Sequence, residues 1–282
     1  MKYHLQLMLA ALIWGCAFVA QSAGMRYVGP WTFNCLRFFL GFATLVLLLP
    51  FLDRIRKKDG RFDRYTVRTG ILCGLVLAAA SMVQQTGIMY TTVGKAGFIT
   101  ALYVVIVPIL SLALGKKVPV LVWAGAALAC IGLYLLSMAE SSRMSAGDLI
   151  ILGCAFLFAV HIMVIDRFSP GCDGVRLSCV QFLTAGAVCF LPMLFIEQPE
   201  GGMVMAAWLP VAYAGIMSCG AAYTLQITGQ AGADPAVASI LLSLESVFSV
   251  LAGWIILQQR LSFRELCGCA VMFIAILIAQ KN

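Results

Sequence analysis

The sequence predicts an all-α integral membrane protein with ten transmembrane helices, arranged as two inverted repeats of five helices. Three observations predict this fold class. Hydrophobic residues make up 62% of the 282 residues and charged residues only 11%, whereas soluble domains carry roughly 25% charged residues. The charges fall in short clusters, and the apolar stretches between them have about the 20 residues needed to cross a bilayer. Part of the first stretch also recurs near the middle of the chain, which indicates an internal repeat.

Each expected helix corresponds to one apolar stretch, taken in order along the chain. The ten expected spans cover residues 4–23, 31–52, 67–89, 95–115, 119–138, 147–165, 174–195, 207–228, 235–257 and 262–280. The longest connections, 53–66 and 196–206, are too short for a separate catalytic or nucleic-acid-binding domain. We therefore expect any function to reside within the helix bundle.

The lysine and arginine residues predict the orientation of the bundle. With the N-terminus inside, the cytoplasmic side holds Lys2, Arg54, Arg56, Lys57, Lys58, Arg61, Arg64, Arg68, Lys116, Lys117, Arg167, Arg176 and Lys281, and the outer side holds Arg26, Lys95, Arg143, Arg260 and Arg264. Since cytoplasmic loops are enriched in these residues, we expect a multi-pass protein of a bacterial-type inner (plasma) membrane with both termini in the cytoplasm. The net charge of +7 then reflects orientation and lipid headgroups, so we expect no nucleic-acid partner.

The sequence lacks the motifs of enzymes and of proteins that depend on nucleotides or metals. Its 11 cysteines lie mostly within expected spans and include no Cys-x-x-Cys pair, and there are only two histidines. No disulfide framework and no metal site are therefore expected. The sequence also has no Walker motif and no Gly-x-Ser-x-Gly motif, so we expect neither an enzyme nor a cofactor.

The two halves of the chain repeat each other. Residues 13–18 (Ile-Trp-Gly-Cys-Ala-Phe) read almost the same as residues 151–156 (Ile-Leu-Gly-Cys-Ala-Phe), at an offset of 138. The same offset pairs Gly97 with Pro235 and Pro108 with Ser246, and an offset of 143 pairs Lys117 with Arg260 and Gly125 with Gly268. We expect two units, residues 1–140 and 141–282, each with five spans. Because five is an odd number of crossings, the second unit enters the membrane from the opposite side, an arrangement that places a binding site near the midplane and favours a transporter.

Short motifs follow one another in a fixed order along the expected spans. They are Trp14-Gly15, Leu36-Arg37-Phe38, Ala96-Gly97-Phe98 with Val107-Pro108, Gly125, Leu241-Leu242 followed by Glu245, and Gly268. In this order the chain resembles the drug/metabolite transporter (DMT) superfamily, in its ten-helix EamA branch of exporters, over nearly its whole length. The resemblance implies efflux of amino acids, their analogues or small drugs, driven by protons or by the substrate gradient alone. The family pattern has Glu-Pro where this chain has Glu245-Ser246.

Glu245 is the sharpest single candidate for a functional residue. It lies about halfway along the ninth span, where an ionised carboxylate is costly unless it is paired, hydrated or protonated. We therefore expect its side chain to face the bundle interior or a hydrated cavity. Two interpretations are open: the carboxylate binds a substrate amine or a coupling proton, or it forms an interhelical hydrogen bond that only holds helices together.

Arg37 and His161 are two further candidates, and each has a structural alternative. Arg37 lies roughly two turns into the second span and is expected either to bond helix-end carbonyls or to pair with a substrate carboxylate or with Glu245. His161 lies about one turn from the cytoplasmic end of the sixth span, where it is either an interfacial residue or part of a proton relay or substrate contact.

Helical spacing gathers polar and aromatic residues into stripes on several spans. In the fourth span the stripe is Thr100, Tyr103, Val107 and Ser111, and the offset of 138 pairs it with Ala238, Leu241, Glu245 and Ser249 in the ninth. We expect both stripes to line one cavity, with a phenol and hydroxyls opposite the carboxylate. Further stripes are Trp14, Phe18 and Gln21, then Ser81 and Gln85, then Tyr223 and Gln226. The resemblance implies a cavity among spans one, three, four, six, eight and nine.

The candidate residues for substrate binding or coupling are therefore Glu245, Tyr103, Thr100, Trp14, Gln85, Tyr223, Ser249, His161 and Arg37. The leading hypothesis is a secondary transporter that exports small metabolites, such as amino acids or amines, by alternating access, with or without proton coupling. An uptake carrier for another small solute is the main alternative, and a membrane enzyme or sensor is a third. The partners expected are a small-molecule substrate, the lipid bilayer and protons. The glycine-rich spans five and ten pack either against each other or in a homodimer.

Overall fold

The computed structural model describes residues 2–56, 60–91, 93–137, 145–257 and 262–279, and throughout these residues the regular structure is helical. The first half contains α1 (Lys2–Gly24), α2 (Pro30–Arg56), α3 (Arg64–Ile88), α4 (Val93–Thr100), α5 (Tyr103–Ala113) and α6 (Val120–Ser137). The second half contains α7 (Ala146–Phe168), α8 (Gly174–Pro192), the π-helical η1 (Met193–Glu197), α9 (Gly201–Ala206), α10 (Trp208–Ala212), the π-helical η2 (Tyr213–Tyr223), α11 (Thr224–Gln230), α12 (Pro235–Leu242), α13 (Glu245–Leu257) and α14 (Phe263–Ala279).

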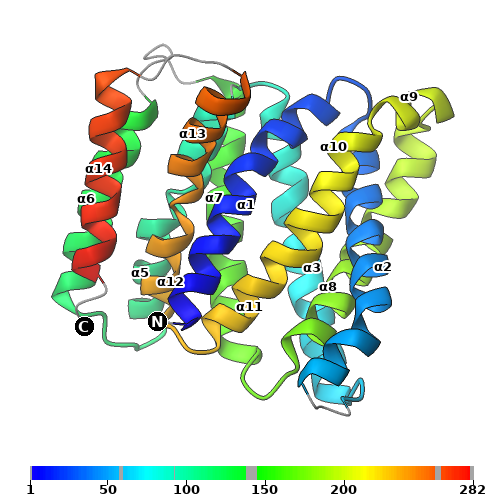
Figure 1. The fold of residues 1–282 in the computed structure, drawn as a ribbon, viewed down its shortest axis with the longest axis horizontal. Helices are drawn as coiled ribbons and strands as arrows, with labels where there is room; N and C mark the ends of the chain where they lie inside the picture. Colours follow the sequence, from blue (N-terminus) through cyan, green and yellow to red (C-terminus); the bar gives the residue numbers. More distant parts are fainter. Residues whose placement is uncertain (1, 57–59, 92, 138–144, 258–261, 280–282) are drawn as a thin grey trace.

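The helices form one bundle, and α1 begins at the same end of it at which α14 ends (Figure 1). Among the described residues, seven helical segments are long and apolar enough to cross a membrane: Lys2–Gly24, Pro30–Ile55, Arg64–Ile88, Lys95–Ala113, Ala146–Phe168, Gly174–Glu197 and Pro235–Ala252. The expected spans at 119–138, 207–228 and 262–280 coincide with other helical structure, namely α6, the succession of α10, η2 and α11, and α14. The described part of the chain thus has the architecture of an all-helical, multi-pass membrane protein.

Glycines allow α6 and α14 to pack closely against each other, as Figure 1 also shows. A Cβ atom added at Gly132 would lie 3.0 Å from the backbone oxygen of Gly268, and one added at Gly125 would lie 3.0 Å from that of Ala275. Small residues are typical of such helix contacts in membranes, because they let two backbones approach. The sequence left two arrangements open for these glycine-rich helices, packing against each other or in a homodimer. In the structure α6 and α14 pack against each other.

Charged side chains tie α7 to α4 and α5 at both of its ends. Ser145 and Asp148 form a capping box at the start of α7, and Lys95 lies 3.5 Å from the Asp148 carboxylate. At the other end, Lys116 forms an ion pair with Asp166. These contacts hold α7 along the broken pair of helices α4 and α5, which carries part of the site.

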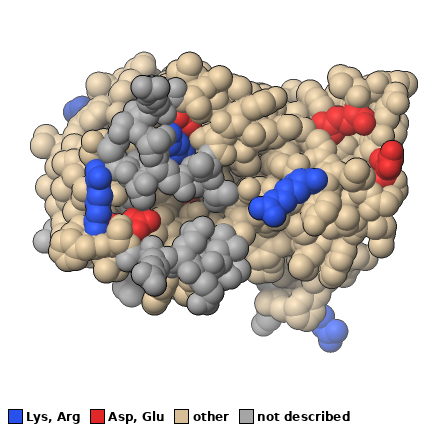
Figure 2. All heavy atoms as spheres, turned by 90° about the horizontal axis from the view of Figure 1, so that it is seen from above, with Lys and Arg blue, Asp and Glu red and all other residues tan. Residues whose placement is uncertain are grey.

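The end of the bundle away from both termini shows mainly uncharged surface, with a few separate charged side chains (Figure 2). Within the described part of this face, no broad patch of one charge is visible. Such a patch is the usual footprint of nucleic-acid binding. The described part of this face shows no such footprint.

Candidate functional site

A cavity lies in the middle of the bundle and combines both halves of the chain. The space between its lining residues amounts to about 460 Å³, part of which is open to solvent. Six of the predicted residues line it: Trp14, Arg37, Thr100, Tyr103, Tyr223 and Glu245. The other lining residues are Phe18, Gln21, Gln84, Phe158, Ile162, Ser218, Gln226 and Leu242. Seven of these fourteen residues are polar or charged and the others are aromatic or apolar, so the walls suit a small solute with both polar and apolar parts.

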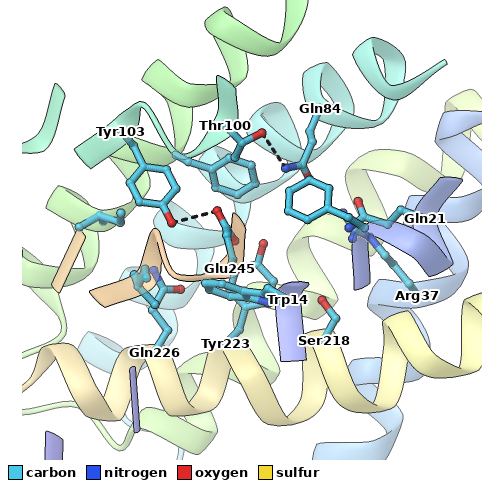
Figure 3. Close-up of a pocket in the computed structure, with 14 residues that line it drawn as sticks. Trp14, Gln21, Arg37, Gln84, Thr100, Tyr103, Ser218, Tyr223, Gln226 and Glu245 are labelled. Carbon is cyan, nitrogen blue, oxygen red and sulfur yellow. Dashed lines mark hydrogen bonds between the residues drawn. The ribbon is translucent and has the colours of Figure 1, made fainter. Parts of the chain in front are cut away.

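Two broken helices meet at the cavity, and each break carries a polar residue. In the first half, α4 ends at Thr100 and α5 begins at Tyr103; in the second, α12 ends at Leu242 and α13 begins at Glu245. The Tyr103 hydroxyl donates a hydrogen bond of 2.9 Å to Oε1 of Glu245 (Figure 3). Both side chains are almost fully buried, with 3% and 4% of their surface exposed. The pair joins the two halves at the point where both helices are interrupted.

The two breaks occupy equivalent places in the two halves. The bounds of α4 and the start of α5 all lie 142 residues before the bounds of α12 and the start of α13. The sequence offset of 138 therefore paired Tyr103 with Leu241, four residues and about one helical turn short of its structural counterpart. Residues four apart lie on the same face of a helix. The polar stripes predicted with the offset of 138 therefore still contain Tyr103 and Glu245, the two residues that are hydrogen-bonded in the structure.

A close approach of α1 to the second break positions the aromatic wall of the cavity. A Cβ atom at Gly15 would lie only 2.7 Å from the backbone oxygen of Glu245 and 2.6 Å from Cβ of Phe248, so only glycine fits there. The neighbouring Trp14 packs edge-on against Tyr223, with 4.7 Å between the ring centroids. Such aromatic pairs favour this geometry. The indole and the phenol together form a rigid apolar surface beside Glu245.

Several polar atoms at the cavity are buried without a hydrogen-bond partner in the described part of the chain. They are Nε1 of Trp14, Oε1 of Gln21, Nε and Nη2 of Arg37 and Oε1 of Gln226. By contrast, Gln84 donates to the Thr100 hydroxyl at 3.4 Å. Since buried polar groups in proteins are nearly always hydrogen-bonded, these atoms are suited to bind a polar solute.

Three predicted residues lie outside the cavity lining. Gln85 is buried and donates to the backbone oxygen of Gln21 at 3.4 Å, so it joins α3 to α1. Ser249 lies on α13, one turn beyond Glu245, and does not line the cavity. His161 is fully buried, although the sequence placed it near the membrane interface. Its Nε2 lies 3.1 Å from Oε1 of Gln181.

His161 instead supports the cavity wall from behind, with its ring edge-on to Tyr223 at 6.0 Å. It does not itself line the cavity. Among the described residues, no group of three or more His, Cys, Asp and Glu side chains is placed to hold a metal ion. The chemistry that the cavity offers is therefore that of one carboxylate, one guanidinium, hydroxyls and amides.

Five residues that line the cavity were not predicted from the sequence: Gln84, Phe158, Ile162, Ser218 and Leu242. Gln84 stands next to Gln85, and the stripe through Ser81 selected Gln85, which does not line the cavity. Ser218 lies five residues before Tyr223 within η2, and the i→i+5 hydrogen bonds of a π-helix bring residues five apart closer to one face than an α-helix does. The three apolar residues carry no signal that distinguishes cavity lining from ordinary packing.

Comparison with known proteins gives consistent results over the full length. A family model described as "EamA-like transporter family" matches residues 1–138 and 145–280. An uncharacterized transporter of Archaeoglobus fulgidus is 29% identical, over 98% of this chain and 85% of the relative. The uncharacterized transporter YwfM of Bacillus subtilis is 25% identical, over 98% of this chain and 93% of its own. One solved crystal structure has the same fold, with a TM-score of 0.80 at 20% identity, over 99% of this chain and 96% of that one.

Proposed function

We infer that this chain, which belongs to the EamA-like transporter family and is thus a membrane transporter, works as a secondary exporter of small metabolites such as amino acids or amines. The observation that carries this inference is the buried Tyr103–Glu245 hydrogen bond, which lies at two helix breaks within a cavity that both halves line. Discontinuous helices at the centre of the membrane are a recurring way to build transport sites.

Glu245 is the group that we assign to substrate or proton binding. The Tyr103 hydroxyl engages Oε1 of the carboxylate, which leaves Oε2 for a substrate ammonium or for a coupling proton. A carboxylate at this depth is costly when it is ionised and unpaired. If Glu245 binds a substrate ammonium on one side of the membrane and a proton on the other, its carboxylate is never ionised and unpaired. Transport of the substrate in one direction is then coupled to transport of a proton in the other.

The proposed architecture has ten spans in two inverted five-helix repeats, residues 1–140 and 141–282. The equivalent breaks at an offset of 142 support it, and so does the common end of the bundle at which α1 begins and α14 ends (Figure 1). Two similar halves with opposite orientation favour two conformations of similar energy, each open to one side. The lysine and arginine bias favours a cytoplasmic location for both termini.

Transport into proteoliposomes tests this function. Purified protein is reconstituted with internal unlabelled solute, and counterflow is measured for a panel of labelled amino acids and amines. We expect uptake of at least one of these solutes by the wild type and none by Glu245→Gln. Glu200→Gln is the matched control, because Glu200 is exposed at the start of α9. Absence of Glu245-dependent movement for every solute would refute the proposed function, and flux that is insensitive to an imposed pH gradient would remove the proton coupling alone.

A further inference from the structure

Exposed arginines gather where α2 ends and α3 begins. Between residues 54 and 68 the sequence has seven lysines and arginines and only two aspartates. Four of these arginines have exposed side chains in the structure and are called the basic surface below: Arg54, Arg61, Arg64 and Arg68. Among the described residues, none of the four forms an ion pair with a carboxylate. Positive charge without an acidic partner therefore dominates this part of the described surface.

The basic surface lies at the boundary of the membrane. The apolar segment of α2 that is long enough to cross a bilayer ends at Ile55, and that of α3 begins at Arg64. Both ends lie at the end of the bundle where α1 begins and α14 ends (Figure 1). Because lipid headgroups lie directly outside the hydrocarbon core, the arginines lie at the depth of the lipid phosphates.

Large apolar side chains accompany the arginines. Ile55, Phe62 and Tyr65 each directly follow an arginine of the basic surface in the sequence, and all three are exposed. Aromatic residues are enriched at membrane–water interfaces, where one part of the ring contacts apolar chains. A soluble polyanion offers no partner for these side chains, whereas a phospholipid offers both a phosphate and acyl chains. The combination therefore favours a lipid as the ligand.

A helix cap fixes the part of the basic surface that lies on α3. The Asp63 carboxylate accepts hydrogen bonds from the backbone N–H of Thr66 at 2.9 Å and from its hydroxyl at 2.6 Å, so the first turn of α3 has a defined start. Arg64 and Arg68 are four residues apart and thus lie on one face of this helix. Two like charges on one face repel each other, and a bound anion between them relieves that repulsion.

A second contact fixes the loop that carries Arg61. The ring centroid of Phe62 lies 5.8 Å from the guanidinium carbon of Arg176, whose Nη1 and Nη2 donate to the Asp53 carboxylate near the end of α2. A Cβ atom added at Gly60 would overlap the same guanidinium, so the loop backbone lies directly against it. The loop is therefore held on the ion pair that joins α2 to α8, and a ligand bound to the loop also stabilises this contact.

We propose that the basic surface is a binding site for anionic phospholipids, such as phosphatidylglycerol, and that the bound lipid stabilises the joined ends of α2, α3 and α8. The guanidinium groups donate to the lipid phosphate, which is the anion that their planar donor geometry suits. None of the four arginines lines the transport cavity. The site is therefore separate from the substrate site, and the proposal does not depend on the identity of the substrate.

The orientation of the chain in the membrane gives the basic residues another role, and the two roles differ in what they predict. Lysine and arginine residues orient a membrane protein while it is inserted. That role predicts no preference for one lipid over another in the folded, purified protein. A binding site predicts that anionic lipid stabilises the folded protein and that the stabilisation depends on these particular arginines.

Lipid-dependent thermal stability of the full-length protein tests the site. The melting temperature in an uncharged detergent is measured against increasing phosphatidylglycerol, and phosphatidylcholine with the same acyl chains is the zwitterionic control. Because a ligand of the folded state raises apparent stability, we expect phosphatidylglycerol to raise the melting temperature more than phosphatidylcholine does. About 1 M sodium chloride should remove the difference, since salt screens exposed charges.

The triple variant Arg61→Gln, Arg64→Gln, Arg68→Gln should lose this preference. Near an anionic surface each arginine strengthens binding by roughly fivefold, so the loss of three should weaken phosphatidylglycerol binding on the order of a hundredfold. The matched control has the same substitution at three exposed arginines elsewhere, namely Arg26, Arg167 and Arg264. It has the same net charge as the triple variant and should keep the wild-type preference.

Equal stabilisation of the wild type by the two lipids overturns the proposal, and so does a preference that persists in the triple variant or is lost equally in the control. Glycerol 3-phosphate and a short RNA are tested as soluble anions. Stabilisation by either one that depends on the three arginines and equals the effect of phosphatidylglycerol overturns the assignment to a lipid. If the triple variant does not fold, the wild-type comparison of the two lipids and its salt dependence decide the question.

Discussion

The phenol of Tyr103 and the carboxylate of Glu245, 142 residues apart in the chain, share a hydrogen bond of 2.9 Å. Each is the first residue of the helix that follows a break, Tyr103 in α5 and Glu245 in α13. A contact between two equivalent places thus links the halves at the wall of the cavity. The bond is therefore a suitable place to measure how the two halves cooperate.

We expect Tyr103→Phe to slow transport by roughly tenfold, because a hydrogen bond to a charged group contributes about 1.5–3 kcal/mol. The ring stays in place and only the donor to Oε1 is lost. Initial counterflow rates measure the effect, and Tyr27→Phe, at an exposed tyrosine, should change nothing. Because Glu245→Gln is expected to abolish transport, the double variant is compared with it by ligand-induced thermal stabilisation, and Tyr103→Phe should weaken solute binding no further when Glu245 is already Gln. An additional tenfold loss of affinity in the double variant would show that Tyr103 acts independently of the carboxylate.

A second prediction concerns the approach of α1 to α13. Gly15→Ala places a methyl group 2.6 Å from Cβ of Phe248 and 2.7 Å from the Glu245 backbone oxygen, so α1 must move outward. Overpacking of this kind costs typically 1–3 kcal/mol, and we expect lower thermal stability together with reduced transport.

Gly153→Ala is the matched control, because the repeat pairs Gly153 with Gly15 while its added Cβ would lie 3.9 Å from Val83. Alanine fits there and favours the helix, so the melting temperature should stay the same or rise slightly. Equal destabilisation by the two substitutions would contradict a specific α1–α13 contact.

Much of this site can be predicted from the sequence, because placing a charged side chain within a membrane costs free energy. A carboxylate in the middle of an apolar span must have an interior partner, and that constraint identified Glu245 and, through the repeat, the stripe of Tyr103. The predicted helix face stays the same when the repeat offset is wrong by four residues, since residues four apart lie on one face. Five of the six predicted residues that line the cavity follow in this way or from stripes of polar and aromatic residues, and Arg37 follows from its place as a charged residue within the second span.

The remaining features depend on backbone geometry that residue types do not report. The π-helical turn of η2 brings Ser218 onto the face of Tyr223, and a 3.6-residue period cannot predict it. For the two adjacent glutamines of α3, a rotation of about 100° decides which one reaches the cavity. His161 is buried because α7 continues to Phe168 and α8 supplies Gln181 as its partner. The helix is interrupted before Glu245 although this chain has Ser246 where the family pattern has proline. The Ser246 hydroxyl donates a hydrogen bond of 3.0 Å to the Gly97 backbone oxygen.

A third prediction concerns the ion pair between α2 and α8. Arg176→Met removes the donors Nη1 and Nη2 from the Asp53 carboxylate and the contact to Asp173. Since 25% of the Asp53 side chain is exposed, breaking this pair should cost less than the roughly 3 kcal/mol of a fully buried pair, and we expect a measurable loss of thermal stability in detergent. Arg167→Met, at an exposed arginine at the end of α7, should have almost no effect. A similar small change for both substitutions would show that the pair is screened by solvent.

The last prediction concerns Glu197, which caps a helix from 166 residues away. Its carboxylate accepts hydrogen bonds from the backbone N–H groups of Trp31 at 2.8 Å and Thr32 at 2.7 Å, two of the unpaired donors at the start of α2. Glu197→Ala should destabilise the protein by about 1 kcal/mol, as loss of a helix cap does. Hydrogen exchange should accelerate at these two amides.

The effect of Glu197→Ala should stay local. Arg37 lies two turns beyond the cap and contacts the rings of Phe33 and Phe38, so solute counterflow should change little although the first turn of α2 loosens. Gly29→Ala should reproduce the faster exchange, because its Cβ would lie 2.4 Å from the Glu197 carboxyl carbon and displace it. Glu200→Ala, which forms no cap hydrogen bond, is the control. Fast exchange that extends past Arg37 would instead show that the Glu197 contact holds the first half of α2 and, with it, Arg37 on the cavity wall.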